Sequence, residues 1–142
     1  MDKRIEIPLA IQIEVFEKQL ILAKKHKKPV ILHCVSAYQE AIEIKKRLKV
    51  NVPMVIHGFS KNIQVAQSLL DNGFYLSFGK YLLRNPELSL VFEQVPNDKF
   101  LLETDMIEET IFDVYEKATS IKRINVADMV ESNFKTIFLQ KD

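Results

Sequence analysis

The sequence predicts an α/β fold built from parallel βα units, and three observations support this prediction. Short apolar runs rich in β-branched residues alternate along the chain with longer amphipathic segments. Pro29 and Pro53 each open one of the short runs, where a proline also ends the preceding helix. The chain has 142 residues, of which 47% are hydrophobic and 27% charged, a composition typical of a globular protein with one core. We therefore expect a single domain spanning residues 1–142.

Four segments are predicted to be buried strands, because each is short, apolar and bounded by turn-forming residues. These strands are expected at residues 29–35, 53–59, 74–79 and 100–105. The segments between them carry apolar residues at helical spacing, as Ile13, Phe16, Leu20 and Ala23 do in the first. The predicted helices span residues 9–27, 37–48, 62–70, 85–94, 108–118 and 126–138.

Local signals place several of these boundaries. Gly73 follows the third helix and can supply the left-handed residue that ends it. Asn85 is expected to cap the fourth helix, with Pro86 at its first position. Strands that alternate with helices pair in parallel through right-handed crossovers. Two architectures fit this pattern: a small open doubly wound sheet, or part of a (β/α)₈ barrel, since a whole barrel needs at least ~200 residues.

Charge and composition exclude several classes of protein. Twenty basic and nineteen acidic residues leave a net charge of +1, so no strong overall field attracts nucleic acid or anionic membrane. The single Cys34 excludes an internal disulfide and fits a cytoplasmic protein. No apolar run reaches the ~18–20 residues of a membrane span, and the charged start MDKRIE is unlike a signal peptide. With three glycines, the chain lacks a glycine-rich phosphate loop.

Three polar residues, His33, His57 and Asp105, each lie at the carboxyl end of a predicted strand. Parallel α/β folds bind ligands at that edge of the sheet. Neutral imidazole and carboxylate are both ligands for Zn²⁺ or Mn²⁺, so the three residues form a candidate metal site. Each residue also has a structural interpretation, because strand histidines are often hydrogen-bonded core residues and an Asp after a strand is often a helix cap.

The ordered segments PVILHCV, IHGFS and ETD follow a helix that contains Gln and Val-Phe, and the chain closes with SNFKTIF. Together they resemble the TatD family of metal-dependent deoxyribonucleases over residues 7–138. The resemblance implies a (β/α)₈ barrel of the metallo-dependent hydrolase type, of which this chain carries strands five to eight. It implies that His33, His57 and Asp105 bind divalent ions (Zn²⁺, Mg²⁺ or Mn²⁺). Asp105 would also act in catalysis, orienting the water that hydrolyses a phosphodiester bond of DNA.

Two family motifs are absent from this sequence: the HxH pair of the first strand and the GExGLD motif of the fourth, whose Glu bridges the metals. The start Met1-Asp2-Lys3 resembles the end of the second motif. After ETD the family has a proline-containing loop, whereas here MIEETI follows. We expect an N-terminally truncated form of such a hydrolase. The alternatives are a catalytically inactive half-barrel remnant, or an assembly module completed by a copy of itself or by a separately encoded first half.

Four other residues lie near the predicted strand ends. Lys61 and Lys80 could bind substrate phosphates, or could be solvated surface lysines. Glu103 shares its alternation with Asp105 and is expected to make a structural hydrogen bond. Cys34 should point away from His33 into the core.

A half barrel predicts how the sheet is covered. Four strands should lie in chain order, with the helices mainly on the convex side and with unpaired edges at the first and last strands. The residues facing the barrel interior (Ile31, Val55, Phe59 and Leu101) should then be exposed. A sheet with helices over both faces would instead favour the doubly wound architecture.

Overall fold

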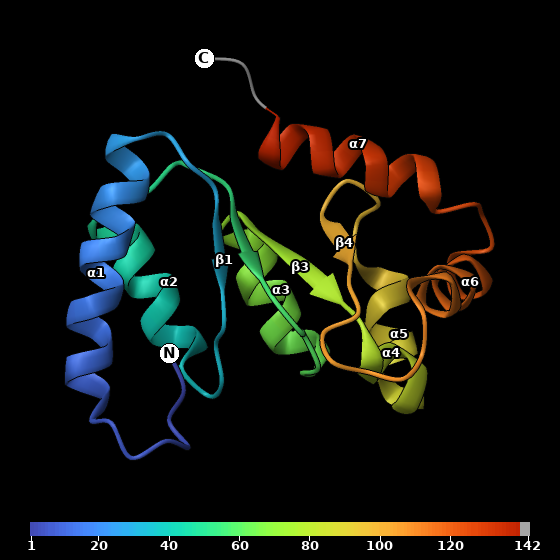
Figure 1. Ribbon diagram of the computed structural model, residues 1–142, viewed down its shortest axis with the longest axis horizontal. Helices are drawn as coiled ribbons and strands as arrows, with labels where there is room; N and C mark the ends of the chain where they lie inside the picture. Colours follow the sequence, from blue (N-terminus) through green and yellow to red (C-terminus); the bar gives the residue numbers. More distant parts are fainter. Residues whose placement is uncertain (140–142) are drawn as a thin grey trace.

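The computed structural model describes residues 1–139, so residues 140–142 of the expected domain lie outside the described part. Its one sheet consists of four short parallel strands (Figure 1): β1 (Val30–Leu32), β2 (Met54–Ile56), β3 (Phe74–Phe78) and β4 (Phe100–Leu102). The strands lie side by side in chain order, β1-β2-β3-β4. A doubly wound sheet reverses its strand order at a switch point. The chain order therefore confirms the barrel-type arrangement, and the doubly wound alternative is wrong.

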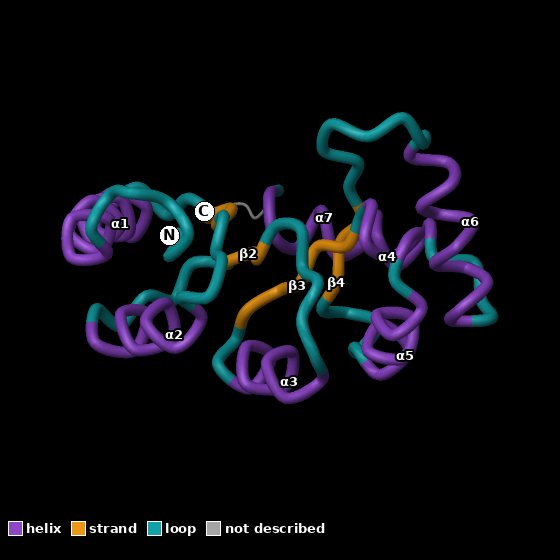
Figure 2. The backbone as a smooth tube through the Cα atoms, turned by 90° about the horizontal axis from the view of Figure 1, so that it is seen from below, coloured by secondary structure: helices purple, strands orange, loops and turns teal. Residues whose placement is uncertain are grey.

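The described chain has seven helices, of which α4 and α5 both lie between β3 and β4 and α6 and α7 both follow β4: α1 (Leu9–Lys25), α2 (Tyr38–Arg47), α3 (Ile63–Asp71), α4 (Lys80–Arg84), α5 (Pro86–Gln94), α6 (Ile111–Lys122) and α7 (Ala127–Phe138). Figure 2 shows α2, α3 and α5 along one face of the sheet. Asn85 caps α5 as predicted, since its side chain accepts a hydrogen bond from the Glu87 N–H. The short helix α4 was not predicted, and Lys80 is its first residue.

The helix-covered face of the sheet forms the centre of the core. Met54, Ile56, Phe74, Leu76 and Phe78 alternate onto this face and are fully buried. A series of edge-to-face aromatic pairs continues from it into α5 and β4. The ring centroids are 5.7 Å apart for Phe59–Phe78, and 4.9 Å apart for both Phe78–Phe92 and Phe92–Phe100.

The opposite face of the sheet is only partly open. Ile31 is 64% exposed, as predicted, but Val55, Phe59 and Leu101 are buried, so the prediction is wrong for these three. Residues of α7 line a cavity of about 520 Å³ together with Ile31, Val55 and Leu101. Phe59 lies beyond the end of β2 and packs on Phe78.

The position of α7 explains why this face is covered. The helix lies across one end of the sheet beside β4 (Figure 1). The Asn133 side chain holds α7 beside β4, because its Nδ2 group donates to the carbonyl oxygens of Asn97 (2.8 Å) and Phe100 (2.9 Å). Among the helices of residues 1–139, none has both the length and the apolar character that crossing a membrane requires.

A capping box fixes the start of α6, three residues later than predicted. Thr110 Oγ1 accepts from the Asp113 N–H at 3.3 Å, and Asp113 Oδ2 accepts from the Thr110 N–H at 2.8 Å. We expect Thr110→Ala to lower the free energy of unfolding by about 1 kcal/mol, measured by urea denaturation. Thr136→Ala, at an exposed position inside α7, is the matched control and should not destabilise. Equal effects of the two substitutions would contradict the capping role.

Candidate metal centre

The three predicted ligands lie at one edge of the sheet. His33 and His57 directly follow β1 and β2, and Asp105 follows β4 by three residues. All three line a cavity of about 330 Å³, and the predicted phosphate-binding residues Lys61 and Lys80 line it as well. The parallel register of the strands brings these side chains together, because each strand ends at the same edge.

His57 lies between two carboxylates. Its Nε2 atom is 3.3 Å from Asp105 Oδ2, and its Nδ1 atom is 2.9 Å from Glu103 Oε1. Two donors bound to one tetrahedral ion by bonds of about 2.1 Å are themselves roughly 3.4 Å apart. The His57 and Asp105 atoms therefore have the separation that a shared ion requires. Glu103 was predicted to make a structural hydrogen bond; its side chain instead makes an ion-pair contact with His57, a candidate ligand.

His33 is close to His57 but does not contact Asp105. The two imidazole centroids are 6.1 Å apart, whereas two imidazoles bound to one tetrahedral ion have centroids about 5 Å apart, so His33 would have to move closer to His57 to share an ion with it. The His33 Nε2 atom instead lies 3.2 Å from Asp2 Oδ2. Within residues 1–139, no three His, Cys, Asp or Glu side chains form a ready-made ligand group. The three-residue ligand set thus remains a prediction, with the His57–Asp105 pair its best-formed part.

Asp2 is a polar residue of this site that the sequence-based set did not include. Its carboxylate is almost buried and accepts from Arg4 Nε (3.0 Å), Arg4 Nη2 (2.8 Å) and the Arg4 backbone N–H (2.9 Å). These bonds hold the pKa of Asp2 well below its usual range. Gln12 fixes the Asp2 backbone, since it accepts from the N–H (2.7 Å) and donates to the carbonyl (3.0 Å). The only sequence signal for Asp2 is its place in Met1-Asp2-Lys3.

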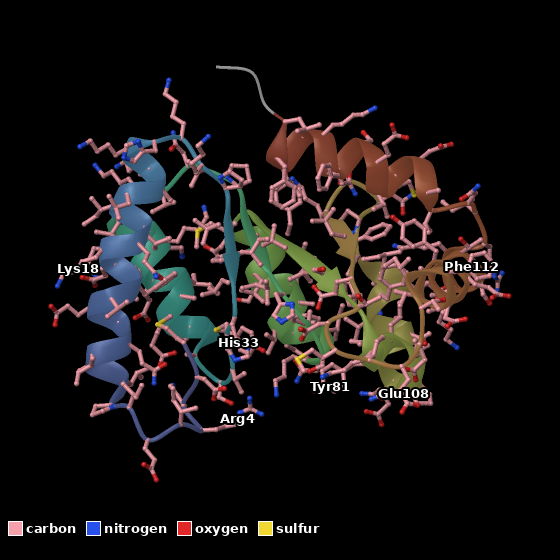
Figure 3. The ribbon with its side chains drawn as sticks, viewed as in Figure 1. Arg4, Lys18, His33, Tyr81, Glu108 and Phe112 are labelled. Carbon is pink, nitrogen blue, oxygen red and sulfur yellow. The ribbon has the colours of Figure 1, made fainter. Side chains whose placement is uncertain are left out.

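Cationic and aromatic side chains surround the cavity. Figure 3 shows Arg4 and Tyr81 on the same side of the molecule as His33, and both line the cavity. Lys80 Nζ lies 5.3 Å from the centre of the Tyr81 ring. Arg4 is engaged with Asp2, whereas Lys61 is exposed. The rim of the cavity thus carries positive charge in a protein of nearly neutral net charge.

Cys34 is buried, as predicted, but it also lines the same cavity as its neighbour His33. Burial raises the pKa of its thiol to about 11, so the sulfur stays protonated at neutral pH. Burial also raises the pKa of Tyr38, on the cavity wall, to about 12. A protonated thiol is a poor metal ligand, which supports the expectation that Cys34 is a core residue.

The backbone at Asp105 adopts an uncommon conformation. Asp105 has φ +59° and Met106 has φ +52°, both in the left-handed region. Asp and Asn tolerate this region better than other non-glycine residues do. Strained backbone of this kind is concentrated at binding and catalytic sites, and here it sets where the carboxylate of Asp105 lies.

Gly79 allows the close approach that positions Glu103. A Cβ atom at Gly79 would lie 2.9 Å from the Glu103 carbonyl oxygen and 3.0 Å from its Cγ atom. The Glu103 N–H also donates to the Phe78 carbonyl at 2.9 Å, so the backbone cannot easily move away. We expect Gly79→Ala to cost about 1–3 kcal/mol of stability, measured as a lower urea midpoint. An unchanged midpoint would show that Glu103 is less tightly packed than this contact indicates.

The arrangement is suited to binding a divalent cation. It combines imidazole nitrogens and a partly exposed carboxylate with an open cavity, and each histidine has a carboxylate other than Asp105 near one ring nitrogen. Histidine ligands of metal ions commonly have such a partner on the nitrogen that does not bind the ion.

Comparison with known proteins identifies related DNases and metal-dependent hydrolases. The family model described as TatD related DNase matches residues 1–139. An uncharacterized metal-dependent hydrolase of Bacillus subtilis, YabD, is 36% identical over 101 residues, which are 69% of this chain and 40% of the relative. Deoxyribonuclease Tat-D of Schizosaccharomyces pombe is 29% identical over 100 residues, which are 69% of this chain and 32% of the relative.

The fold is similar to that of solved TatD homologues. The crystal structure of YJJV, a TatD homologue from Escherichia coli K12, superposes with a TM-score of 0.86 at 23% identity. The match covers 99% of this chain and 62% of that structure. The matches thus cover between 32% and 62% of the length of these relatives. The match along residues 1–139 shows that this chain belongs to the TatD family of related DNases and metal-dependent hydrolases.

Proposed function

We propose that this chain forms the part of a TatD-type hydrolase that binds a divalent ion and cleaves phosphodiester bonds of DNA. The observation that carries the proposal is the 3.3 Å separation of His57 Nε2 and Asp105 Oδ2 at the carboxyl edge of a parallel sheet. This separation fits two donors to one ion. The name of the fission yeast relative, a deoxyribonuclease, supports DNA as the substrate class.

The proposed roles of the residues follow from their chemistry. His33 and His57 would bind Zn²⁺, Mg²⁺ or Mn²⁺ as neutral imidazoles, and Asp105 would bind it as a carboxylate. When bound, such an ion polarises the phosphoryl group and activates a water molecule. Asp105 is 48% exposed at its side chain, so it can also accept a proton from water in the cavity. Lys61 and Lys80 would hold the phosphates at the rim.

The proposal is tested by joining this chain to an N-terminal segment that carries the family's HxH and GExGLD motifs. We expect the joined protein to hydrolyse linear DNA with Zn²⁺, Mg²⁺ or Mn²⁺ and to lose this activity with EDTA. His57→Ala should abolish the activity, whereas His26→Ala, at the exposed end of α1, should not change it. Hydrolysis in EDTA that survives His57→Ala would contradict the proposal, as would no hydrolysis with any of the three ions. The chain alone should hydrolyse DNA poorly, because those motifs supply further ligands.

A second candidate function is an assembly module that binds a strand-bearing partner beside β1. The observation that favours it is an apolar hollow of about 390 Å³ between α1 and β1. Ile7, Ile11, Val15 and Ile31 line it, and each is at least 50% exposed, which is unusual for so many large apolar residues together.

Sedimentation of the chain alone separates the two functions. Self-association that Ile31→Lys removes would support an assembly module that pairs with its own copy. A monomer at all concentrations would contradict self-pairing and leave the joined barrel as the functional unit.

A further inference from the structure

Charge is unevenly distributed along this chain, although its net charge is only +1. Residues 24–49 contain eight lysines and arginines and only two acidic residues, which gives this segment a net charge of +6. The rest of the chain holds 12 basic and 17 acidic residues, a net charge of −5. The basic residues of the segment lie in the last turns of α1 and α2 or directly after them: Lys24, Lys25, Lys27, Lys28, Lys45, Lys46, Arg47 and Lys49.

The two groups form one surface because α1 and α2 end side by side. Lys24 Nζ donates to the Leu48 carbonyl oxygen at 3.0 Å, which joins the ends of the two helices. Figure 1 shows both helices ending on the side where β1 begins, and Figure 3 shows His33 at the opposite end of β1. Five lysines are exposed there and form no ion pair within residues 1–139; we call them the lysine surface: Lys25, Lys27, Lys28, Lys46 and Lys49.

Helix dipoles do not explain this concentration of lysines. Cations are favourable at a helix C-terminus because they offset the dipole, which would require basic residues at every helix that ends at this edge. The helices α3 and α5 also end there, since each leads directly into a strand, yet neither has a basic residue in its last turn. In addition, Lys27, Lys28 and Lys49 lie beyond the ends of their helices.

Both helices end in the same motif, with lysine at the position that usually takes glycine. A backbone N–H donates back by five residues in each, to the carbonyl of Ala23 in α1 (2.9 Å) and of Lys45 in α2 (3.0 Å), as in a Schellman motif. Lys27 and Lys49 are the left-handed residues, with φ 51° and 52°. Glycine is more stable in this conformation than a residue with a Cβ atom. Two lysines at such positions indicate a use in binding rather than in folding.

We infer that the lysine surface binds the phosphate backbone of DNA, at a place separate from the candidate metal centre. Lysines bind phosphates as point charges and do not read the base sequence. Neighbouring helix axes lie about 8–10 Å apart, which is comparable to the ~6–12 Å width of a DNA groove. The ends of α1 and α2 can therefore contact phosphates on both sides of one groove. The choice of DNA among polyanions rests on the proposed function, whereas the charge distribution does not.

An anionic membrane is the less favoured partner for this surface. Peripheral membrane binding draws on apolar side chains that enter the lipid as well as on charge. The exposed residues of both turns, at positions 24–28 and 46–49, are all lysine, arginine or histidine. The surface thus offers charge without an apolar anchor, as contacts to a nucleic acid backbone do.

The test is fluorescence anisotropy of a labelled duplex with the chain in EDTA, at several NaCl concentrations. We expect log K to fall with log salt with a slope of about −4 to −5, since five lysines contact phosphates. Lys25→Ala/Lys28→Ala should weaken binding about 10-fold and make the slope less steep by about 2. The matched control is Lys117→Ala/Lys135→Ala, which removes two exposed lysines from α6 and α7. Equal effects of the two double substitutions would overturn the inference.

Lys27→Gly/Lys49→Gly separates binding from folding, because the two effects have opposite signs. Glycine suits the left-handed backbone at both positions, so the melting temperature should rise. The affinity for DNA should nevertheless fall, and the salt slope should again lose about 2. A more stable variant that binds DNA as the parent does would overturn the inference, because it would give the two lysines no part in binding.

Two further measurements identify the partner and separate this inference from the proposed function. Tighter binding to phosphatidylserine vesicles than to DNA at the same salt concentration would overturn the choice of DNA. In the joined protein, Lys25→Ala/Lys28→Ala should raise the KM for long DNA several-fold and leave hydrolysis of bis(p-nitrophenyl) phosphate unchanged. A joined protein that cleaves DNA while these variants bind it normally would overturn this inference alone. Binding that depends on the lysine surface, without cleavage by the joined protein, would overturn the proposed function alone.

Discussion

Asp105→Asn is expected to raise the Kd of this chain for Zn²⁺ by about 100-fold or more, measured by isothermal titration calorimetry. The Asn side chain replaces an anionic oxygen ligand by a neutral one, a larger change than the loss of a supporting hydrogen bond, which costs about 10–100-fold. Asn also tolerates the left-handed backbone found at Asp105 (φ +59°). The fold should therefore persist, and the change in Kd should report the ligand alone.

The matched control is Asp98→Asn, the same substitution at an exposed residue before the opposite end of β4. This variant should bind Zn²⁺ within about twofold of the parent. Zn²⁺ binding that is equally weakened by the two substitutions, or by neither, would contradict Asp105 as a ligand. In the joined barrel, the Asp105→Asn variant should also lose metal-dependent DNA hydrolysis.

Phe92→Ala should have the largest effect on stability, about 3–5 kcal/mol. Phe92 is fully buried in α5, and its ring lies between those of Phe78 and Phe100, each with centroids 4.9 Å away. Truncation removes both aromatic contacts and leaves a cavity between the helix layer and the sheet. The measurement is the free energy of unfolding from urea denaturation, together with the slope that reports exposed surface.

Phe112→Ala provides the control within the same chain. Phe112 is 71% exposed on α6 (Figure 3), so its loss should change the free energy of unfolding by no more than about 0.5 kcal/mol. A loss of less than about 1 kcal/mol in Phe92→Ala would mean that the Phe92 ring is not packed between those of Phe78 and Phe100.

The order of elements could be predicted from the sequence because each strand is a separate apolar run. The strands themselves are shorter than predicted, since β1 ends at Leu32 and β2 at Ile56, before their histidines. Ser36 and Gly58 have positive φ, at 56° and 62°, and turn the chain away soon after the strands end. The pattern of apolar residues contains no signal for such a turn, so the predicted strands extended to residues 35 and 59.

The covering of the sheet could not be predicted because it depends on long-range contacts. Asn133 of α7 donates to Asn97 and Phe100, which lie 36 and 33 residues earlier in the chain. Nothing near Asn133 in the sequence indicates those partners. The burial of Val55 and Leu101 follows from this placement of α7, whereas the half-barrel arrangement without α7 on this face predicts that they are exposed.

The residues of the candidate site also divide into those that could be predicted from the sequence and those that could not. His33, His57 and Asp105 could be predicted because strand ends of a parallel sheet converge on one edge. Asp2 could not, because it reaches His33 only through long-range backbone pairing of the first residues with Val35 beside β1. Arg4 could not either, because it is placed by its contact with Asp2. Alternation along its strand did indicate Glu103 as a polar partner, but the identity of the ring atom it contacts required the structure.

The most direct test of a shared ion is anomalous X-ray diffraction from crystals of this chain grown with Zn²⁺. We expect an anomalous peak at about 2.0–2.2 Å from both His57 Nε2 and Asp105 Oδ2, with His33 as a third ligand. Peaks confined to surface residues such as His26, with none between His57 and Asp105, would contradict the assignment of this edge of the sheet as a metal centre.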